Sequence, residues 1–427
     1  MIRKIIVVFV TLFISMASFA QVNNTSAYSF FGIGDKNTAY TTEQASMGGV
    51  GVNFSEMHRI NLSNPASNAS LNFTNYTLGL VSKNTGYEQN GLTQRASATY
   101  ILYLAMGFNI GTRGGLSFGL LPNTSVGYNL ISRDYDDDGN TIEATSYEGE
   151  GGTNKVFVGF GYNPVKGLNL GLQGNYVFGK VENSIVSQII GSSLATKYET
   201  ISNIQGFSLN AGIQYKTKIA ENVNVYVGGN VILENEVKSK EKEYLYSAGI
   251  ISLGTARDTI LNNSGTGYLT NPIKSTVGLG VGRDNKWYLG VDYSFQKAIN
   301  LEESVYNNPL VMYDDYERIA IGGFYTPKYN SILKYWNRVT YRAGFHVEQS
   351  GLMIDSEKDG GEFNAVNNYG ISFGIGLPVG KQLSNLNFGF EYGKRGNSDH
   401  NLVQENFFNF RMSISLNDKW FKKQIIY

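Results

Sequence analysis

Cysteine is absent from the 427 residues of this chain. Its absence excludes disulfide bonds, thiolate zinc sites, a cysteine nucleophile and a lipid-modified N-terminal cysteine. Charge is also scarce, at 16% of residues, where an average protein has about 25%. Because 35 basic residues balance 35 acidic ones, the chain has no basic excess, and nucleic-acid binding is not expected.

Long apolar runs are missing beyond the first 20 residues, so residence in a membrane would require a β-barrel. The first 20 residues are typical of a secretory signal. Arg3 and Lys4 precede an apolar run from Ile5 to Met16, and Ser18-Phe19-Ala20 forms a small-residue cleavage site. A transmembrane anchor is the alternative, but the run has about 12 residues and a spanning helix needs about 20. We therefore predict a mature chain that begins at Gln21.

Glycine (50 residues), tyrosine (29) and phenylalanine (24) are abundant, and the apolar residues recur with a period of two. From about residue 72 onward, apolar residues alternate with small or polar ones over roughly ten positions between turns, which is typical of outer-membrane barrel strands. The segment 287–298, for example, places Leu289 and Val291 on one face and Asp292 on the other. Strands are predicted at 72–88, 96–110, 115–134, 146–163, 167–190, 195–219, 223–247, 272–283, 287–298, 317–328, 338–350, 369–379, 383–396 and 402–421.

These segments predict an all-β fold, an antiparallel transmembrane β-barrel of about fourteen strands, because bacterial barrels have an even strand number. A soluble β-sandwich would also alternate, but its strands are short and do not usually end in aromatic girdles. Short connections such as 111–114, 163–167 and 283–286 are predicted to be periplasmic turns, so both termini would lie in the periplasm. The long polar connections, which should face the outside, are 132–152, 238–271, 298–315 and 349–367.

Residues 21 to about 70 lack this alternation and contain two short motifs, Met47-Gly48-Gly49 followed by Asn64-Pro65-Ala66. This order resembles the N-terminal motif of the FadL superfamily of outer-membrane transporters for hydrophobic compounds. The opening Tyr28 to Asp35 and the closing Glu391 to Gly396 resemble a branch of this superfamily that is common in Bacteroidota. The resemblance extends over the mature chain, and it implies a fourteen-stranded barrel whose N-terminal segment folds back as a hatch inside the lumen.

On this basis we expect three parts: a signal peptide (1–20), an N-terminal hatch (21–70) and a transmembrane β-barrel (71–427). A lumen of this width needs a plug if water is not to pass. A disordered periplasmic tail is the alternative for residues 21–70. Gly-Gly and Asn-Pro-Ala are turn sequences rather than tail sequences, which favours the hatch.

Pro122 interrupts the third predicted strand. Because proline cannot donate to the ladder and a closed barrel has no edge strand, a bulge or kink is expected there. The resemblance implies that Leu121, Pro122 and Asn123 mark a lateral window, through which an apolar substrate leaves the lumen for the membrane. A local bulge with no part in transport is the alternative.

Charged residues of both signs are predicted to face the lumen, because they alternate with apolar residues on the strands. They are Asp292, Arg342, His346, Glu348, Glu391 and Arg411. We expect them to hold the hatch rather than to catalyse a reaction. His346 and Ser350 would be about 13 Å apart at ~3.3 Å per residue, too far for a hydrogen-bonded nucleophile and base. The three histidines also lack a lipase-like or zinc-like spacing.

Asp134, Asp136 and Asp138 begin a D-x-D-x-D-G run, which is how calcium loops begin. Thr145 stands where such a loop needs a bidentate glutamate, and the flanking residues are strand-like. A hairpin turn is therefore the favoured interpretation, calcium is the alternative, and no metal or other cofactor is predicted.

The sequence thus predicts a non-enzymatic outer-membrane barrel. By resemblance, it would take up small hydrophobic compounds passively and release them laterally at Pro122. The alternative is a non-transporting accessory subunit of an outer-membrane machine for barrel assembly or protein secretion. The expected partners are outer-membrane lipid and either a small hydrophobic ligand or other outer-membrane proteins. A continuous apolar cavity that reaches Pro122 would favour transport, whereas a solid hatch would favour the accessory role.

Overall fold

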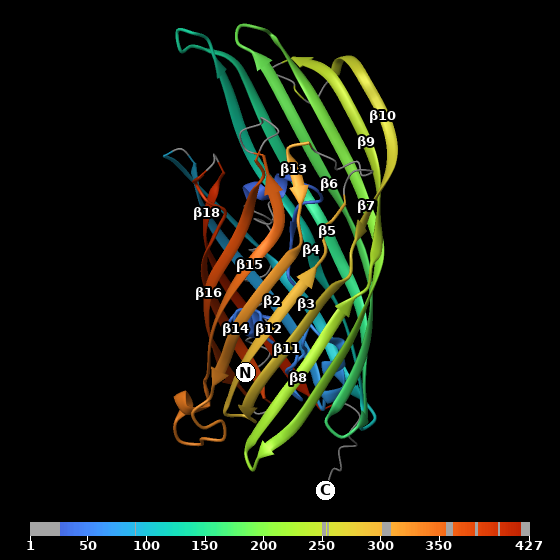
Figure 1. The fold of residues 1–427 in the computed structure, drawn as a ribbon, viewed down its shortest axis with the longest axis vertical. Helices are drawn as coiled ribbons and strands as arrows, with labels where there is room; N and C mark the ends of the chain where they lie inside the picture. The colour runs from blue at the N-terminus through green and yellow to red at the C-terminus, as the bar shows by residue number, and fades with distance from the viewer. Residues whose placement is uncertain are drawn as a thin grey trace.

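The computed structural model describes residues 26–419, apart from 90, 250–252, 254–255, 301–308, 356–361, 381–382 and 400–401. The predicted signal peptide lies outside the described residues. An antiparallel sheet closes on itself where β18 pairs with β2 (Figure 1). Its wall strands are β2 (Thr74–Gln89), β3 (Leu92–Ile110), β4 (Gly114–Tyr135), β5 (Thr141–Val165), β6 (Leu168–Ile189), β7 (Leu194–Ala220), β8 (Val223–Ile232), β9 (Asn235–Gly249), β10 (Ala256–Asn271), β11 (Lys274–Arg283), β12 (Trp287–Gln296), β13 (Val311–Tyr313), β14 (Tyr316–Tyr325), β15 (Thr340–Ile354), β16 (Asn364–Val379), β17 (Ser384–Arg395) and β18 (Gln404–Asp418).

The barrel wall has fourteen strands, because three of them are built from two pieces each. β8 and β9 form one wall strand, because they pair with successive parts of β7. β11 pairs with β8 and β10 pairs with β9, so β10 and β11 form the next wall strand. β13 and β14 likewise pair with successive parts of β15. The predicted all-β fold and the even strand number are confirmed. Among the residues that the structure describes, no helix is long and apolar enough to cross a membrane.

Alternation along each strand turns apolar side chains outward and polar ones into the lumen. On β12, Leu289 and Val291 are 52% and 42% exposed, whereas the neighbouring Tyr288 and Asp292 are buried. Continuous exposed apolar faces of this kind fit a barrel surrounded by lipid. Exposed aromatic side chains contribute to the outward face: Tyr176, Phe178, Phe207 and Tyr268.

The strands of the barrel wall differ widely in length. β5 and β7 have 25 and 27 residues, whereas β12 and β14 have 10 each, and a membrane strand needs only about 9–11. The long strands, teal to yellow in Figure 1, rise well beyond the rest of the wall. We call this part the raised wall: residues 127–135 of β4, 141–150 of β5, 182–189 of β6, 194–203 of β7, 238–249 of β9 and 256–268 of β10.

The raised wall shows that the prediction of long external loops at 132–152 and 238–271 was wrong. β4 pairs with β5 as far as Tyr135 opposite Thr141, and β9 pairs with β10 over most of the second range. The pattern missed these strands because an antiparallel sheet outside a membrane needs no apolar face toward lipid. At the opposite end the connections are short, except for residues 326–339 between β14 and β15, which contain η3 (Tyr335–Arg338).

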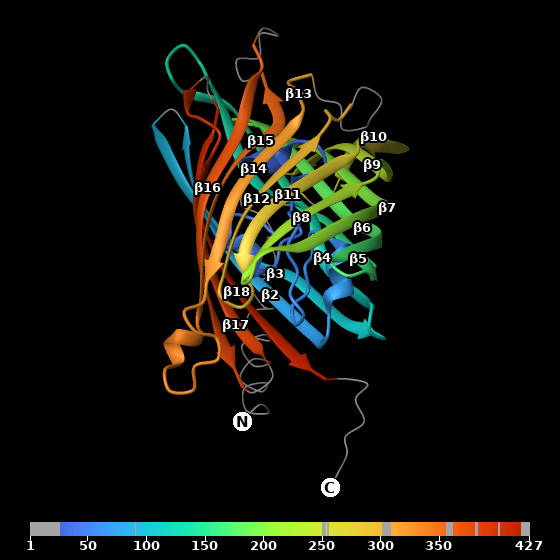
Figure 2. The ribbon, with the colours of Figure 1, turned by 60° about the horizontal axis from the view of Figure 1, so that its bottom comes forward.

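The N-terminal segment, residues 26–73, lies inside the barrel, where Figure 2 shows it in blue between the strands. It contains η1 (Ala27–Phe30), β1 (Asp35–Lys36), α2 (Thr42–Ala45) and η2 (Pro65–Ser70). Val50 and Ala66 are fully buried and Leu71 is 2% exposed, so the segment packs against the wall. The division of the chain into domains near residue 70 stays a prediction; β2 begins at Thr74.

Glycines on the inner wall make room for this segment. A Cβ atom on Gly171 would lie 2.2 Å from the backbone nitrogen of Ala66, and one on Gly344 would lie 2.1 Å from the carbonyl carbon of Met47. A larger residue at either position would collide with backbone. Part of the high glycine content therefore follows from two layers of chain that approach each other closely.

Candidate functional site

Met47, Gly48 and Gly49 form a tight loop after α2 that presses on the wall. Gly48 and Gly49 have φ angles of 68° and 87°, a backbone conformation that favours glycine. The Gly48 amide donates to Ser372 Oγ at 2.8 Å, and its carbonyl oxygen accepts from Arg318 Nη2. The first motif is thus fixed to both β16 and β14.

Asn64, Pro65 and Ala66 begin η2, and Asn64 is fully buried. Asn64 Oδ1 accepts from the Ala66 amide at 3.0 Å, which caps the helix, while proline is favoured at the first helical position. Asn64 Nδ2 donates to the carbonyl oxygen of Val52 at 2.6 Å and to that of Gly229 at 3.1 Å. One side chain therefore ties η2 both to its own segment and to β8.

Asp292 is one of the predicted luminal residues, and it anchors the loop between the two motifs. Its Oδ2 accepts from the amides of Gly51 and Val52 at 2.8 and 3.0 Å, and the residue is 4% exposed. A buried carboxylate is stable only when donors of this kind replace water. Asp292 therefore holds the backbone of the N-terminal segment.

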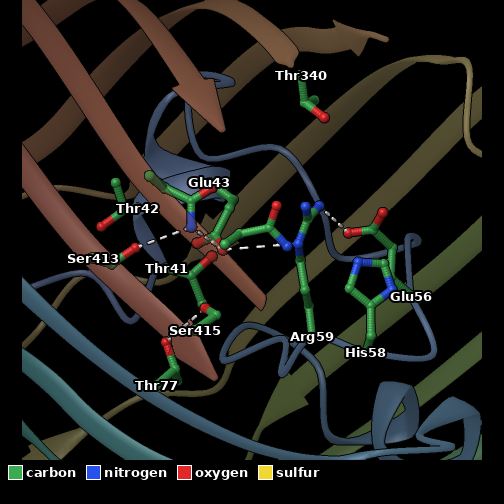
Figure 3. Close-up of polar contacts among 12 residues, drawn as sticks. Thr41, Thr42, Glu43, Glu56, His58, Arg59, Thr77, Thr340, Ser413 and Ser415 are labelled. Carbon is green, nitrogen blue, oxygen red and sulfur yellow. Dashed lines mark hydrogen bonds and ion pairs between the residues drawn. The ribbon is translucent and has the colours of Figure 1, made fainter. Parts of the chain in front are cut away.

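Arg59 lies between two carboxylates of its own segment (Figure 3). Arg59 Nη1 is 2.5 Å from Glu56 Oε2, and Arg59 Nε is 4.0 Å from Glu43 Oε1. Glu43 Oε1 also accepts from Asn387 Nδ2 of β17 at 2.9 Å. The predicted luminal residue Arg342 donates to Oδ1 of the same Asn387 at 3.4 Å. The space beside this cluster is a cavity of about 40 Å³.

A larger cavity, of about 270 Å³, lies between residues 26–49 and the wall. Four predicted luminal residues line it: His346, Glu348, Glu391 and Arg411. Arg411 Nη2 is 2.7 Å from Glu391 Oε2, and His346 Nδ1 is 3.9 Å from Glu391 Oε1. The structure thus brings these residues together and places Asp292 and Arg342 elsewhere.

Arg318 also lines this cavity, although it is not among the residues predicted from the sequence. Its Nε lies 3.2 Å from Glu348 Oε2, and its Nη1 donates to the hydroxyl of Tyr40 at 3.2 Å. The alternation along the strand indicated that Arg318 faces the lumen. Arg318 is on the same strand face as Ala320, and the apolar Ile319 between them is on the other face. With Lys36, Lys83, Lys274 and Arg395 also in its lining, the cavity is charged. Residues 121–123 are not among its lining residues.

Pro122 lies at a register shift in the β4–β5 ladder, between Pro122 and Thr124. In the described part of the chain, β3 and β4 pair only where Leu104 to Ile110 face Leu120 to Gly114. Beyond that point β3 pairs with β2, and β4 pairs with β5. The ladder of the wall is therefore interrupted between β3 and β4, directly beside the proline.

The N-terminal segment fills this interruption. β1 pairs with β4 next to Pro122. The Asn37 amide donates to the carbonyl oxygen of Asn123 at 2.9 Å, and the hydroxyl of Tyr100, on β3, donates to Asn37 Oδ1 at 3.1 Å. Leu121 points inward into a buried apolar cluster. Asn37 therefore bridges the two separated strands.

The acidic run forms the hairpin between β4 and β5. Asp136 Oδ1 accepts from the amides of Asp138 and Asn140 at 3.0 and 2.7 Å, and Oδ2 accepts from Asn140 Nδ2 at 3.1 Å. These bonds, above all the one from the Asn140 side chain, lower the pKa of Asp136. Asp134 lies on the ladder opposite Glu143. Within the described ranges, no group of three or more His, Cys, Asp or Glu side chains could hold a metal ion.

The fold is the one found in FadL-type outer-membrane barrels. The toluene transporter TodX from P. putida is similar with a TM-score of 0.59 and 15% identity, over 89% of this chain and 99% of that one. The toluene transporter TbuX from Ralstonia pickettii gives 0.58 and 13%, over 89% and 98%. A Pseudomonas aeruginosa FadL homologue gives 0.58 and 12%, over 90% and 99%. At these identities the likeness shows the fold alone, and it agrees with the fold that the resemblance implied.

The chain belongs to the BamG family, whose model matches residues 1–426. No curated protein matches the sequence. The similar solved structures are channels and transporters rather than enzymes. Membership of a Bacteroidota branch stays a prediction.

Proposed function

We propose that this chain is a non-transporting accessory subunit of an outer-membrane protein machine, for barrel assembly or protein secretion. One observation carries the proposal: the lumen is filled by the N-terminal segment, and the space that remains is charged. Residues 21–70 then act as a hatch that stays seated. The signal peptide, residues 1–20, directs export.

The remaining cavity is a poor place for an apolar ligand. Apolar burial stabilises by about 25 cal/mol per Å² only where apolar surface meets apolar surface. Here a ligand would displace water from the Arg411–Glu391 and Arg318–Glu348 pairs and leave charges poorly solvated. The cavity, at about 270 Å³, is also below the about 300 Å³ at which ligand pockets begin.

The raised wall supports a partner role, because it provides sheet surface well beyond the apolar band of the barrel. We place the end with short connections, and both termini, in the periplasm, and the raised wall outside the cell. The membership of the BamG family agrees with a place in a protein complex.

Purification from the native outer membrane in mild detergent tests this proposal. The same preparation is analysed by mass spectrometry for co-purifying proteins and for lipophilic small molecules. We expect at least one protein at constant stoichiometry and no lipophilic molecule at equal molar amount. A stoichiometric apolar ligand without a constant protein partner would contradict the accessory role.

The second candidate is passive uptake of small hydrophobic compounds with lateral exit, and the interrupted ladder beside Pro122 favours it. Exit by this route requires Asn37 to leave its place between Tyr100 and Asn123. Uptake of labelled toluene by cells that carry Pro122→Val tests it, with Pro378→Val, on β16, as the matched control. Transport predicts a loss for Pro122→Val only; equal uptake by both variants and the parent chain would exclude the window.

A further inference from the structure

The raised wall has a concave face that continues the inner face of the barrel. Side chains on a strand alternate between its two faces, so residues known to point inward identify the other inward residues on the same strand. Val126, Val181, Val237 and Leu269 are buried against Ile33 of the N-terminal segment. Counting along the strands in steps of two from these residues identifies every side chain of the concave face.

One row of this face is apolar from strand to strand. Each member lies directly opposite the next in the ladder, and the six members are Leu130, Tyr147, Ile185, Tyr198, Leu245 and Leu261. Leu130 is 39% exposed and the other five are half-buried. The ring of Phe30 covers one end, 6.2 Å from the ring of Tyr147. We call this set the apolar row.

The apolar row is one residue wide. The next inward row toward the hairpin tips has hydroxyl side chains on five strands and ends at Asp258 of β10. The hydroxyl residues are Ser132, Thr145, Ser187, Thr196 and Ser247. On the other side, the row contains Asn183, Thr200 and Glu243, each also in direct register. At about 4.8 Å between neighbouring strands, the six members span about 24 Å.

The two faces of the raised wall differ in charge. The outward face carries both lysines and glutamates, such as Lys197 and Glu199, whereas the charged residues described on the concave face are acidic. On β9 the strict alternation from Lys238 to Glu243 turns Lys238, Lys240 and Lys242 outward and Glu241 and Glu243 inward. Glu143 of β5 and Asp134 of β4 are also inward. Among the described side chains of the concave face, from the level of Val181 to the hairpin tips, none is lysine or arginine.

The carboxylates lie close to the apolar row. The hydroxyl of Tyr198 donates to Glu243 Oε1 at 3.2 Å. Partial burial and the negative charge of Glu243 raise the pKa of Glu241. Both observations indicate a face on which negative charge is concentrated and has no basic neighbour to balance it.

We propose that the concave face of the raised wall binds a cationic, amphipathic polypeptide segment of a partner protein. The apolar row receives the apolar side chains of that segment, and Glu143, Glu241 and Glu243 pair with its lysines or arginines. Charge complementarity favours this occupant over an anionic lipid, which the inward carboxylates would repel. This inference rests on the proposed accessory function and names the chemistry of the partner.

The test places a photo-crosslinking amino acid at Leu245, in the full chain in its native membrane. The matched control carries it at Tyr244, the adjacent position on the opposite face of β9. We expect Leu245 to crosslink to one protein, through a segment that peptide mapping shows to be basic and apolar, and Tyr244 not to crosslink to that segment. In a Glu241→Gln/Glu243→Gln background the yield at Leu245 should fall about tenfold, because both charge pairs are lost. The Glu→Asp pair should retain it.

Several results would overturn the inference. They are a mapped segment that is neutral or acidic, crosslinks to lipid or to a second copy of this chain, and a yield that the Gln pair does not change. The failures of the two proposals are distinguishable. If a protein co-purifies at constant stoichiometry but Leu245 does not crosslink to it, the docking face is wrong and the accessory role stands. If no protein co-purifies, the accessory role fails as well.

Discussion

The two parts of the N-terminal segment are held in the barrel by different means. Residues 41–70 are held by close fit, with buried backbone against wall glycines and amides bound to Asp292. Residues 26–40 border the charged cavity and are held partly by ion pairs at its edge, such as Arg395 with Asp35, whose side chains are 15% and 21% exposed. A closely packed segment does not tolerate a larger side chain at the contact. Ion pairs near water contribute little to stability. We call residues 41–70 the deep part and residues 26–40 the outer part. Both stay in the lumen, but the outer part should open locally more often than the deep part.

Replacing Gly171 by leucine should disturb the deep part most. Its side chain would overlap the backbone of Ala66, and overpacking against backbone costs about 3 kcal/mol or more. We expect residues 41–70 to become accessible to protease and the barrel to unfold at lower urea concentration. Gly174→Leu is the control, because a Cβ there meets only the end of Leu209, at 4.0 Å. Equal behaviour of the two variants would show that the fit is not tight.

Asp292→Ala removes the acceptor of two buried amides. Leaving these donors unpaired should lower the free energy of unfolding by about 2 kcal/mol. Asp292→Asn keeps an acceptor oxygen, so its free energy of unfolding should fall much less. Urea unfolding in detergent measures both, and a neutral effect of the alanine variant would mean that other groups satisfy Gly51 and Val52.

His58 gives the deep part a pH dependence. Burial lowers its pKa from 6.5 to about 4, so the folded chain holds the imidazole neutral while the unfolded chain protonates it below pH 6.5. Stability is therefore complete above pH 6.5 and falls as the pH drops toward 4, by up to about 2 kcal/mol at pH 5. Carboxylates also titrate in this pH range, so the parent chain is compared with His58→Gln. The variant should lose less stability than the parent chain between pH 7.5 and pH 5. An unchanged loss would place the titration elsewhere.

Arg395→Gln should have the smallest effect. The pair with Asp35 contributes on the order of 1 kcal/mol or less, so global unfolding should hardly change. Hydrogen exchange of residues 26–40 should nevertheless quicken, while exchange of residues 41–70 stays as in the parent chain. Faster exchange in both ranges would remove the distinction between the deep and outer parts.

Much of the barrel could be predicted from alternation alone, because lipid on one side and a polar lumen on the other impose a period of two. Segments such as 287–298 and 383–396 carry this pattern in full and agree with β12 and β17 to within two residues. β10 was missed because its residues outside the membrane band, such as those from Asn262 to Gly267, are polar or glycine on both faces. No local pattern distinguishes such a strand from a polar loop.

The site was less accessible to sequence reasoning. Turn chemistry pointed to Gly48 and to Asn64, whose cap and backbone conformation are local properties. Their wall partners, such as Ser372 and Gly229, follow from tertiary contacts between residues far apart in the chain. Which luminal charges meet is set by strand height and tilt, so Glu391 and Arg411 could be assigned to the lumen but Arg318 could not be assigned to Glu348.

The connection of the N-terminal segment to β2 has a consequence for assembly. β2 follows the segment directly and is also the strand that pairs with β18, the last strand of the chain, so the barrel closes only when both ends of the wall are available. The residues that fill the lumen precede every strand of the wall in the chain. They can therefore be enclosed sideways by a sheet that is still open, and need not be threaded through a finished cylinder. Chain order is compatible with this route, because the interior segment precedes the wall and the β2–β18 seam needs the last strand.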